Sequence, residues 1–540
     1  MNQAQLKNII TNLSKTRIKN RENFNTLVKR YAGSYQEPSP LNSELLQAYR
    51  QLVKSKKIKP SKGLEKHLQK RSVRSMSGVA VITCLTKPMG CPHTCVFCPT
   101  EDRMPKSYLS NEPAVMRALM NQWDPYRQVK TRLKALSRHG HATDKIELIV
   151  IGGTWSAHPK RYQAWYVKRL LDALNGKTST TLLQAQKLNE KASHRCVGLT
   201  LETRPDWIDE AEIKQLRKLG CTRVEIGIQN PRDDILKLSR RGHGVKEIVQ
   251  ATKLLKEAGF KICYHTMPQL PGSTPAIDLQ MYKDLYGKEK FQPDLVKIYP
   301  TAVVKTAELY DWMKRGDYTP YSDAKLKTVL KKAKLLTPEY VRIVRLIRDI
   351  PAESIEGGNK ITNLRQLISY ELKKESKACQ CIRCREVGHQ SENKKSLGQP
   401  IKLRVKKYRA SGGTEYFISF ASQDNAILYA YVRLRINDES KDHHLQELRN
   451  AALIREIHTY GPHVKLGESG MIQHTGLGKK LMAEAEYIAG QENRKRIKAK
   501  KSSIAKVAVI AAAGVREYYR KLGYRLDGTY MSKRLLATGK

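Results

Sequence analysis

The stretch PMGCPHTCVFC at residues 88–98 decides the fold, because it spaces Cys91, Cys95 and Cys98 as CxxxCxxC. A structural zinc ion usually takes four protein ligands. Three thiolates on one short loop suit instead a 4Fe-4S cluster that leaves one iron without a protein ligand. We therefore predict a cluster held by these three cysteines and shielded by Phe97. Structural zinc and free thiols are the alternatives.

The same spacing resembles the signature of the radical S-adenosylmethionine superfamily. In that superfamily the free iron binds the amino and carboxylate groups of S-adenosylmethionine, and a glycine-rich motif after the second strand hydrogen-bonds the methionine amino group. Gly152, Gly153 and Thr154 fit that motif by their position. Glu202, at the end of a later strand, is expected to bind ribose hydroxyls, and a surface capping role is its alternative.

Strand and helix signals alternate after the cysteines. β-rich runs are expected at 145–151, 196–201, 223–228, 262–267 and 295–298, and glycines end the helices between them. This alternation predicts the α/β class, as a partial βα (TIM-like) barrel or a doubly wound sheet. Sites in such folds lie at the C-terminal ends of the strands. The residues that follow the strands are therefore site candidates: Gly152, Gly153, Thr154, Glu202, Thr203, Gln229 and Asn230.

Cys379, Cys381 and Cys384 form a second cluster, spaced CxCxxC in a Lys- and Ser-rich connector at residues 371–400. Three thiolates so close together repel one another unless a cation binds them. Zinc is the expected metal, and a second iron–sulfur cluster is the alternative. A closed tetrahedral zinc site needs a fourth ligand, which is His389 or a residue from elsewhere.

A third motif, Q-x-x-G-x-G, contains Gln473, Gly476 and Gly478 and opens a helix with apolar residues at helical spacing. Its glycines expose backbone N–H groups at a helix N-terminus, a geometry that binds a pyrophosphate. The pattern resembles the N-acetyltransferase (GNAT) superfamily, in which that pyrophosphate belongs to acetyl-CoA. Strand signals on both sides of the motif indicate a separate α+β domain over residues 401–540.

The chain carries 99 Lys and Arg against 51 Asp and Glu, a net charge of +48 over 540 residues. Such a surplus repels itself unless a polyanion binds, so nucleic acid is the expected partner. Residues 1–75 alone hold 17 Lys and Arg against 4 Asp and Glu. Basic helices at 15–30 and 54–74, with an apolar-spaced helix at 41–53, predict an RNA-binding arm. The alternatives are solvated helix faces without a ligand and a basic protein that is merely soluble.

The cysteines and the hydropathy pattern indicate the cellular compartment of the protein. Six of the ten cysteines fall in the two clusters, which favours bound metal in a reducing cytoplasm over disulfides. Cys196, Cys221 and Cys263 lie in strand-like runs and are expected to be small buried hydrophobes. The first residues are polar and no run of about 18 apolar residues exists. We therefore expect neither a signal peptide nor a membrane partner.

The order of these parts closely resembles the catalytic subunit of Elongator. The similarity runs from residue 76 to the C-terminus and includes the segments 91–99, 126–132, 144–154, 297–301, 345–351, 363–366, 381–387 and 515–531. The short cysteine spacing, followed by Pro99-Thr100, departs from eukaryotic members and suggests a stand-alone bacterial or archaeal form. The expected domains are a basic helical tRNA-binding region (1–75), a radical S-adenosylmethionine domain (76–370), the zinc connector (371–400) and the GNAT-like domain (401–540).

The resemblance implies a tRNA carboxymethyluridine synthase, an acyltransferase that acts on carbon 5 of the anticodon wobble uridine. A radical made from S-adenosylmethionine would take hydrogen from the acetyl methyl group, the acetyl carbon would add to the uridine, and the thioester would be hydrolysed. The implied partners are the tRNA anticodon stem-loop and an electron donor, and the chain could form a homodimer. The rival interpretations are a protein lysine acetyltransferase with a structural cluster and a non-catalytic RNA-binding scaffold.

The resemblance also maps acetyl-CoA contacts onto both domains. Lys145 lies in the radical domain, so the two domains would share this co-substrate. The contacts in the GNAT-like domain are Glu456, Ile457, His458, Thr459, Leu477, Gly478, Lys479 and Tyr519. Tyr518 and Tyr519 are the expected catalytic residues, because a tyrosine of this late element can approach the thioester. Plain core packing is the alternative for both tyrosines.

Overall fold

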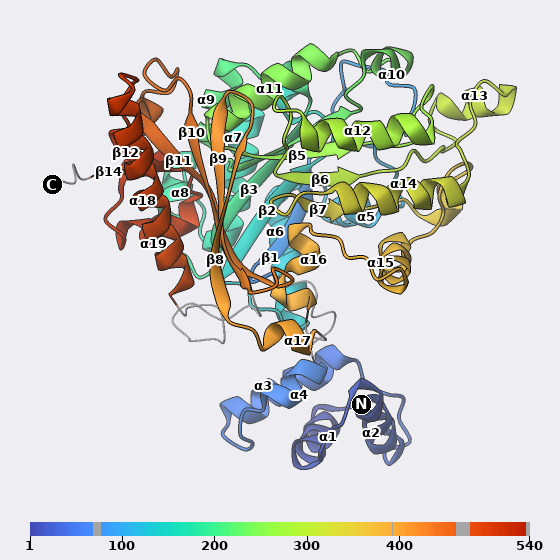
Figure 1. Ribbon diagram of the computed structural model, residues 1–540. Helices are drawn as coiled ribbons and strands as arrows, with labels where there is room; N and C mark the ends of the chain where they lie inside the picture. Colours follow the sequence, from blue (N-terminus) through green and yellow to red (C-terminus); the bar gives the residue numbers. More distant parts are fainter. Residues whose placement is uncertain (69–76, 391–392, 461–475, 536–540) are drawn as a thin grey trace.

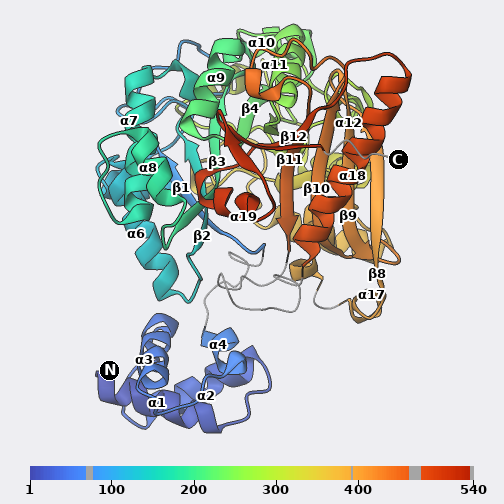
Figure 2. The same ribbon diagram turned by 90° about the vertical axis from the view of Figure 1, so that its left-hand side faces the viewer.

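The computed structural model describes residues 1–68, 77–390, 393–460 and 476–535. Within these residues the chain forms two seven-stranded sheets and a block of N-terminal helices (Figure 1). Figures 1 and 2 both place the N-terminal block on one side of the body that the two sheets form. Over the same residues, no helix has the length and apolar content that a membrane crossing requires.

The first sheet is parallel throughout, and its strands follow one another in chain order. The strands are β1 (Ala80–Leu85), β2 (Lys145–Ile151), β3 (Arg195–Thr203), β4 (Arg223–Gln229), β5 (Lys261–Thr266), β6 (Leu295–Ile298) and β7 (Arg342–Arg345). A doubly wound sheet reverses its strand order at a switch point, and this sheet does not. The predicted partial βα barrel is therefore confirmed, and the doubly wound alternative is wrong.

Helices flank this sheet (Figure 1). They are α5 (Pro113–Met120), α6 (Pro125–Arg138), α7 (Lys160–Asn175), α8 (Leu182–Asn189), α9 (Glu210–Leu219), α10 (Asp233–Leu238), α11 (Val245–Glu257), α12 (Pro275–Gly287), α13 (Leu309–Arg315), α14 (Asp323–Leu336) and α15 (Leu364–Lys374). Local chemistry sets their ends. At α9, the Asp209 side chain accepts a hydrogen bond from the backbone N–H of Glu212, and Gly220 stops the helix in a left-handed conformation.

The second sheet is mixed, with the strand order β13-β14-β12-β11-β10-β9-β8. Its elements are β8 (Ile401–Arg409), β9 (Gly413–Ser422), β10 (Leu428–Asn437), β11 (Ala451–Thr459), β12 (Lys506–Val509), β13 (Arg525–Asp527), β14 (Tyr530–Arg534), α18 (Leu477–Lys498) and α19 (Arg516–Arg520). β11 and β12 form the parallel pair, and they pair only from Ala451 to Ile454 on β11. β12 ends at Val509, so beyond Ile454 this side of β11 has no partner strand among the described residues.

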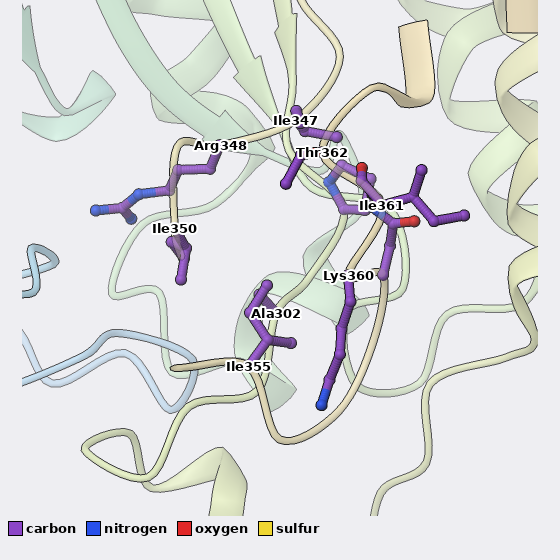
Figure 3. A pocket seen from close by; sticks show the side chains of 10 residues that line it. Ala302, Ile347, Arg348, Ile350, Ile355, Lys360, Ile361 and Thr362 are labelled. Carbon is purple, nitrogen blue, oxygen red and sulfur yellow. Dashed lines mark hydrogen bonds between the residues drawn. The ribbon is translucent and has the colours of Figure 1, made fainter. Parts of the chain in front are cut away.

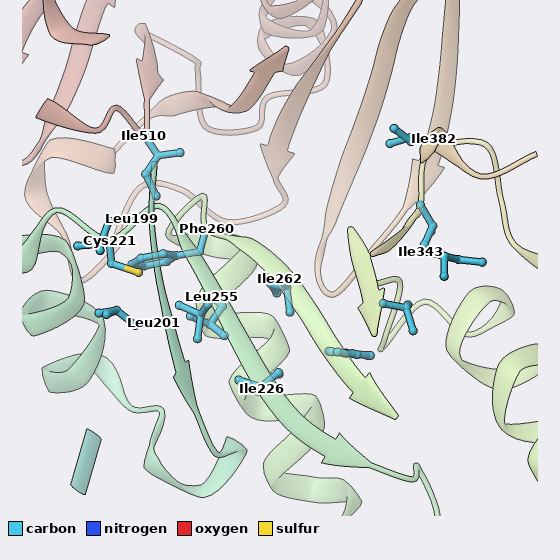
Figure 4. Packing of buried hydrophobic residues seen from close by; sticks show 14 of the residues in the cluster. Leu199, Leu201, Cys221, Ile226, Leu255, Phe260, Ile262, Ile343, Ile382 and Ile510 are labelled. Carbon is cyan, nitrogen blue, oxygen red and sulfur yellow. The ribbon is translucent and has the colours of Figure 1, made fainter. Parts of the chain in front are cut away.

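The apolar core of the barrel continues into the second sheet. Figure 4 shows Leu201, Ile226 and Ile262 packed between strands and helices of the barrel. Ile382 of the connector and Ile510, just after β12, belong to the same buried cluster. Cys196 of β3 and Cys263 of β5 are buried as predicted, and Cys221 is buried too, although it lies before β4 and not in a strand. Burial of one continuous apolar cluster stabilises the two sheets together.

The N-terminal block encloses a core of its own. Its helices are α1 (Gln3–Lys15), α2 (Arg21–Gly33), α3 (Asn42–Lys54) and α4 (Lys62–Leu68). Arg50 reaches the body of the molecule and donates a hydrogen bond to the Ser137 carbonyl at 2.8 Å. The helix expected over 15–30 is broken, because Asn20 caps a new helix after α1 has ended. The other basic helix is shorter than expected, and residues 69–74 lie outside the described ranges.

A connector of two short helices, α16 (Ile382–Arg385) and α17 (Lys394–Leu397), joins the barrel to the second sheet. Arg385 anchors it on both sides. Its guanidinium donates to the Glu339 carbonyl, just before β7, at 2.9 Å, and to Asn425 Oδ1, between β9 and β10, at 2.6 Å. The backbone of the connector is therefore tied to both sheets.

A buried ionic network also joins the two sheets. Arg455 Nη1, on β11, lies 3.0 Å from Asp294 Oδ1 of the barrel and 2.9 Å from Glu415 Oε2 of β9. Lys256 Nζ lies 3.6 Å from both carboxylates. All four side chains are buried. Burial alone would raise the pKa of Asp294, but Arg455 and Lys256 lower it, so this carboxylate stays ionised at neutral pH.

Removing Asp294 should therefore destabilise the junction strongly. In Asp294→Ala, Arg455 keeps its buried charge but loses an anion, which costs about 3–5 kcal/mol. We expect a loss of that size in the free energy of unfolding, measured by urea denaturation. The control is Asp317→Ala, whose pair with Arg315 is exposed and should contribute less than about 1 kcal/mol. Equal losses for the two variants would contradict the role of the network.

Candidate active site

One large cavity runs between the two sheets. Its volume is about 1370 Å³, more than the roughly 300–1,000 Å³ of a pocket for one small ligand. Phe97 of the cysteine loop lines one part of it, and Gly476 at the start of α18 lines another. Lys145 of the barrel and Glu456 of β11 line it as well. The two motifs that the sequence places hundreds of residues apart therefore open onto one space.

The length of strand β2 gives an estimate of the distance between the cysteine loop and the motif at Gly476. Lys145, Glu147, Ile149 and Ile151 alternate along its seven residues and line the cavity. With a rise of about 3.3 Å per residue, the strand spans about 20 Å. Its C-terminal end leads into the Gly152-Gly153 turn beside the cysteine loop. Its N-terminal end, with Lys145, belongs to the part of the cavity next to the second sheet.

The sulfur atoms of the cysteine loop are too far apart for a site with a single metal ion. The sulfur atoms of Cys91, Cys95 and Cys98 do not all lie within 4.8 Å of one another, although those of the connector cysteines do. Thiolates on one zinc ion, each about 2.3 Å from the metal, would lie roughly 3.8 Å apart. A cluster takes one thiolate on each of three irons and so suits the wider arrangement. The residues present fit the group that the sequence predicts.

Buried polar groups surround these sulfur atoms. Cys91 Sγ lies 3.7 Å from Thr154 Oγ1, and Cys95 Sγ accepts a hydrogen bond from Arg241 Nη1 at 3.4 Å. Burial, with the neighbouring Cys95, raises the pKa of the Cys98 thiol to about 11. Such a thiol becomes a thiolate when a cation binds it. The loop is therefore built for bound metal and disfavours three free thiolates.

The Gly152-Gly153 turn packs against Thr86, just after β1, and the next residue, Thr154, reaches Cys91 of the cysteine loop. Gly152 has a φ of +131°, and a Cβ there would meet Thr86 Oγ1 at 2.2 Å. Gly153 is also left-handed, with a φ of +98°. Glycine is needed at the first position both for its conformation and for its close contact. The turn presents backbone groups to the space beside Cys91.

Glu202 and Gln229 line the cavity near this turn. Glu202 accepts a hydrogen bond from the Tyr108 hydroxyl at 3.1 Å. It therefore faces the interior, and the surface capping alternative is wrong. Gln229 is buried with a left-handed φ of +62°, and its Oε1 has no hydrogen-bond partner among the described residues. Both side chains can accept hydrogen bonds from a ligand.

Sequence reasoning missed a group of charged side chains in the middle of the cavity wall. Glu225 Oε2 lies 2.9 Å from His265 Nε2 and forms an ion pair with Lys297. Burial opposes the charge of Glu225, but Lys297 and His265 lower its pKa well below the usual range. The three residues come from β4, β5 and β6. The sequence does contain a pattern that could have identified them, because polar residues occupy every second position of these otherwise apolar strands.

Cys263 lies within 4.8 Å of the Glu225 and His265 ligand atoms, so these three could in principle hold a metal ion. Lys297 and Arg223 already contact the same carboxylate. A cation there would add a third positive charge around Glu225, which electrostatics disfavours. We interpret the group as an internal ion-pair network that faces the cavity.

The predicted acetyl-CoA contacts meet where β11 extends beyond its pairing with β12. Glu456 Oε2 pairs with Arg433 at 3.0 Å, and His458 Nε2 lies 2.7 Å from the Ser77 carbonyl. Gly476 opens α18 in a left-handed conformation, and a Cβ on Gly478 would stand 3.0 Å from the Tyr518 hydroxyl. The remaining predicted contacts also line the cavity: Lys145, Ile457, Thr459, Leu477, Lys479 and Tyr519. Gln473 lies outside the described residues.

Tyr518 and Tyr519 pack edge to face, with ring centroids 5.2 Å apart. Burial raises the pKa of Tyr518 to about 12, so its hydroxyl stays protonated and can donate a hydrogen bond. Tyr519 is buried more deeply and also joins the core of the second sheet. Both side chains therefore line the cavity, and Tyr519 has a packing role besides.

The connector cysteines form a compact, largely buried group. The sulfur atoms of Cys379, Cys381 and Cys384 lie within 4.8 Å of one another, which suits a single metal ion. Lys334 Nζ lies 3.7 Å from Cys384 Sγ. No fourth His, Cys, Asp or Glu of the described residues joins the group, and His389 stands apart from it. His389 is close to the cysteines in sequence, but its imidazole does not lie beside their sulfur atoms.

A small pocket adjoins the main cavity near the end of the barrel. Ile347, Arg348, Ile350 and Ile361 are among its lining residues (Figure 3). Its volume is about 30 Å³, room for one or two water molecules. Arg348 also lines the main cavity, so the pocket is a recess of that cavity.

The cysteine loop, the glycine turn and the parallel half-barrel together define a radical S-adenosylmethionine protein. The model of the radical SAM superfamily matches residues 87–285, and that of the radical SAM C-terminal domain matches residues 293–374. The tRNA uridine(34) acetyltransferase of Methanocaldococcus infernus is 45% identical over 92% of each chain. That of Dehalococcoides mccartyi is 43% identical over 86% of this chain and 100% of the relative.

More distant relatives and a solved structure agree. Human Elongator complex protein 3 is 36% identical over 87% of this chain and 86% of its own. The structure of Methanocaldococcus infernus Elp3 with an N-terminal deletion has a TM-score of 0.73 and 42% identity, and covers 85% of this chain and 100% of that one. The chain therefore belongs to the family of tRNA uridine(34) acetyltransferases and Elongator complex protein 3. The expected family resemblance is confirmed.

The glycine turn gives a direct test of the site. In Gly152→Ala the new Cβ would overlap Thr86, so the turn must move away from the cysteine loop. We expect S-adenosylmethionine binding by the reconstituted protein to fall at least tenfold, measured by equilibrium dialysis. The control is Gly176→Ala, which is also left-handed but has no atom within 4 Å of the new Cβ. It should cost about 1 kcal/mol of stability and leave binding intact.

Proposed function

We propose that this chain transfers a carboxymethyl group, derived from acetyl-CoA, to carbon 5 of the wobble uridine of tRNA. One observation carries the proposal: a single cavity joins the cysteine loop at Phe97 to the GNAT-like motif at Gly476 and Gly478. The relatives' name, tRNA uridine(34) acetyltransferase, supports the substrate. It gives no support to the lysine acetyltransferase alternative.

The cysteine loop would hold a 4Fe-4S cluster through Cys91, Cys95 and Cys98. When bound, this group supplies the electron for reductive cleavage of S-adenosylmethionine, and an external donor must replace that electron. The chain's own task is to orient the co-substrate. The Gly152-Gly153 turn offers backbone groups beside the loop, and Glu202 and Gln229 offer acceptors for polar groups of the nucleoside. Phe97 and Tyr108 limit the entry of water at this end.

Acetyl-CoA would enter from the other end of the cavity. Backbone N–H groups at the start of α18 would bind its pyrophosphate. Backbone groups of β11 at Glu456, Ile457 and His458, beyond its pairing with β12, would pair with the amides of the extended pantetheine arm. Lys145 faces this region from the barrel, and Tyr518 can donate a hydrogen bond to the acyl group. The acetyl group would then point along β2 towards the cysteine loop.

The RNA would lie at the entrance of the cavity. Its anticodon loop must deliver one base to the interior, because the cavity lies between the two sheets. The N-terminal helices, rich in Lys and Arg, would bind the stem-loop through its phosphates. We also propose zinc at Cys379, Cys381 and Cys384, and two thiolate metal sites fit the reducing cytoplasm.

The central experiment is anaerobic turnover. The reconstituted protein is incubated with dithionite, tRNA, S-adenosylmethionine and acetyl-CoA, and the digested tRNA is analysed by mass spectrometry. We expect carboxymethyluridine, lost without acetyl-CoA and in Cys95→Ala. Cys196→Ala, a buried cysteine outside both clusters, should keep activity. Acetylated protein lysines formed without S-adenosylmethionine, with tRNA unmodified, would favour the lysine acetyltransferase alternative.

Substituting a cysteine of one metal site should release the metal of that site and leave the other site occupied. Cys95→Ala should lose iron and inorganic sulfide but keep zinc, because the connector sulfur atoms are a separate group. Cys381→Ala should lose zinc, since two thiolates hold it far less tightly than three. Both contents are measured by plasma mass spectrometry and a colorimetric sulfide assay. Joint loss of both metals in either variant would contradict two separate sites.

A further inference from the structure

Arg383 lies on the short helix α16, between the connector cysteines Cys381 and Cys384. Its side chain is half-buried and lines the main cavity. Within the described part of the chain it forms no ion pair and no side-chain hydrogen bond. A guanidinium carries five N–H donors and is always charged. A half-buried one with no acceptor is therefore costly unless a ligand supplies the acceptor.

Neighbouring arginines show the contrast. Arg342 pairs with Glu386 at 2.9 Å and donates to the Tyr460 hydroxyl at 3.0 Å. Arg385, two residues from Arg383, has acceptors on both sides of the connector. Arg365 donates to the Ile343 carbonyl at 3.1 Å. Of these four arginines, Arg383 is the one without an acceptor among the described residues.

The local charge balance favours an anion at this position. The positive charges of Arg342 and Arg365 both act unfavourably on Arg383. The acidic groups that act on it are Glu386, whose carboxylate Arg342 already holds, and the thiol of Cys381. An incoming phosphate would meet the guanidinium groups of Arg342 and Arg383, which both line the cavity, beside one neutralised acid. Planar guanidinium groups match the oxygen geometry of phosphate.

The position of the connector limits the source of such a phosphate. His458, Tyr460 and Gly476 line the same cavity, so coenzyme A is one source. Figures 1 and 2 place the connector on the side of the two-sheet body that faces the N-terminal helices. RNA bound to those helices is the other source. In both cases the ligand chemistry is a phosphate oxygen.

We propose that Arg383 is a phosphate-binding residue of the cavity, presented by the cysteine connector. Metal bound at Cys381 and Cys384 would fix the backbone on both sides of it. The connector is then part of the binding site as well as a link between the sheets. The RNA form of this inference rests on the proposed function, whereas the coenzyme A form needs only the acetyl-CoA site.

Salt dependence of binding gives the test. Binding of a fluorescent anticodon stem-loop RNA and of acetyl-CoA is measured for the full chain, R383Q, R383M and R383K, and zinc content is checked for each. Loss of one contact to a single-stranded phosphate lowers the slope of log K against log salt by about 0.7. We expect both neutral variants to show that loss with a several-fold weaker affinity, and R383K to keep the slope.

A weaker affinity for acetyl-CoA, with the RNA slope unchanged, would assign the phosphate to coenzyme A instead. Unchanged binding of both ligands by R383Q and R383M would overturn the proposal. The control is Arg232→Gln, an exposed arginine paired with Asp234 outside the cavity lining, which should change neither ligand. The experiment measures binding and not turnover. A changed salt dependence would therefore support the role of Arg383 even if the chain modified no tRNA.

Discussion

The contact of Arg455 with Asp294 and Glu415 is the constraint on which the site depends. Apolar burial between the sheets supplies free energy but no orientation, because the hydrophobic effect is not directional. Buried charges differ, since they are tolerated only where each meets its partner. A shifted packing of the second sheet would separate Arg455 from Asp294 and Lys256 from Glu415. The network therefore selects one placement of β11 against the barrel, and with it the place of Glu456 relative to Lys145.

The cavity wall changes in character from one end to the other. Near the second sheet it is rich in cations, which suit the phosphates of a nucleotide or of RNA. In the middle, Glu225, His265 and Lys297 balance one another. At the cysteine loop, Phe97 and Met267 contribute apolar surface. A reactive species is best kept in such a dry region.

Much of the site could be predicted because its parts are local in sequence. Metal ligands and glycine turns need fixed residue types at short spacing, so Cys91 to Cys98 and Gly152-Gly153 are visible at once. Glu225, His265 and Lys297 are not, because they belong to three strands and meet only in the folded barrel. Arg455 and Asp294 lie 161 positions apart, and neither stands out locally. The helix expected over 15–30 failed for a different reason: Asn20 caps a second helix within a uniformly basic stretch.

Strand β2 has one more consequence. A hydrogen-bonded strand in the middle of a sheet cannot stretch, so the distance from Lys145 to Gly152 is fixed. An acyl donor anchored by its pyrophosphate at α18 would extend a fixed distance along β2 towards the cysteine loop. An acetyl group would end at one depth, and each added methylene would carry the reactive carbon past it. Chain-length selectivity would then follow from the length of a backbone, without a pocket shaped to exclude larger acyl groups.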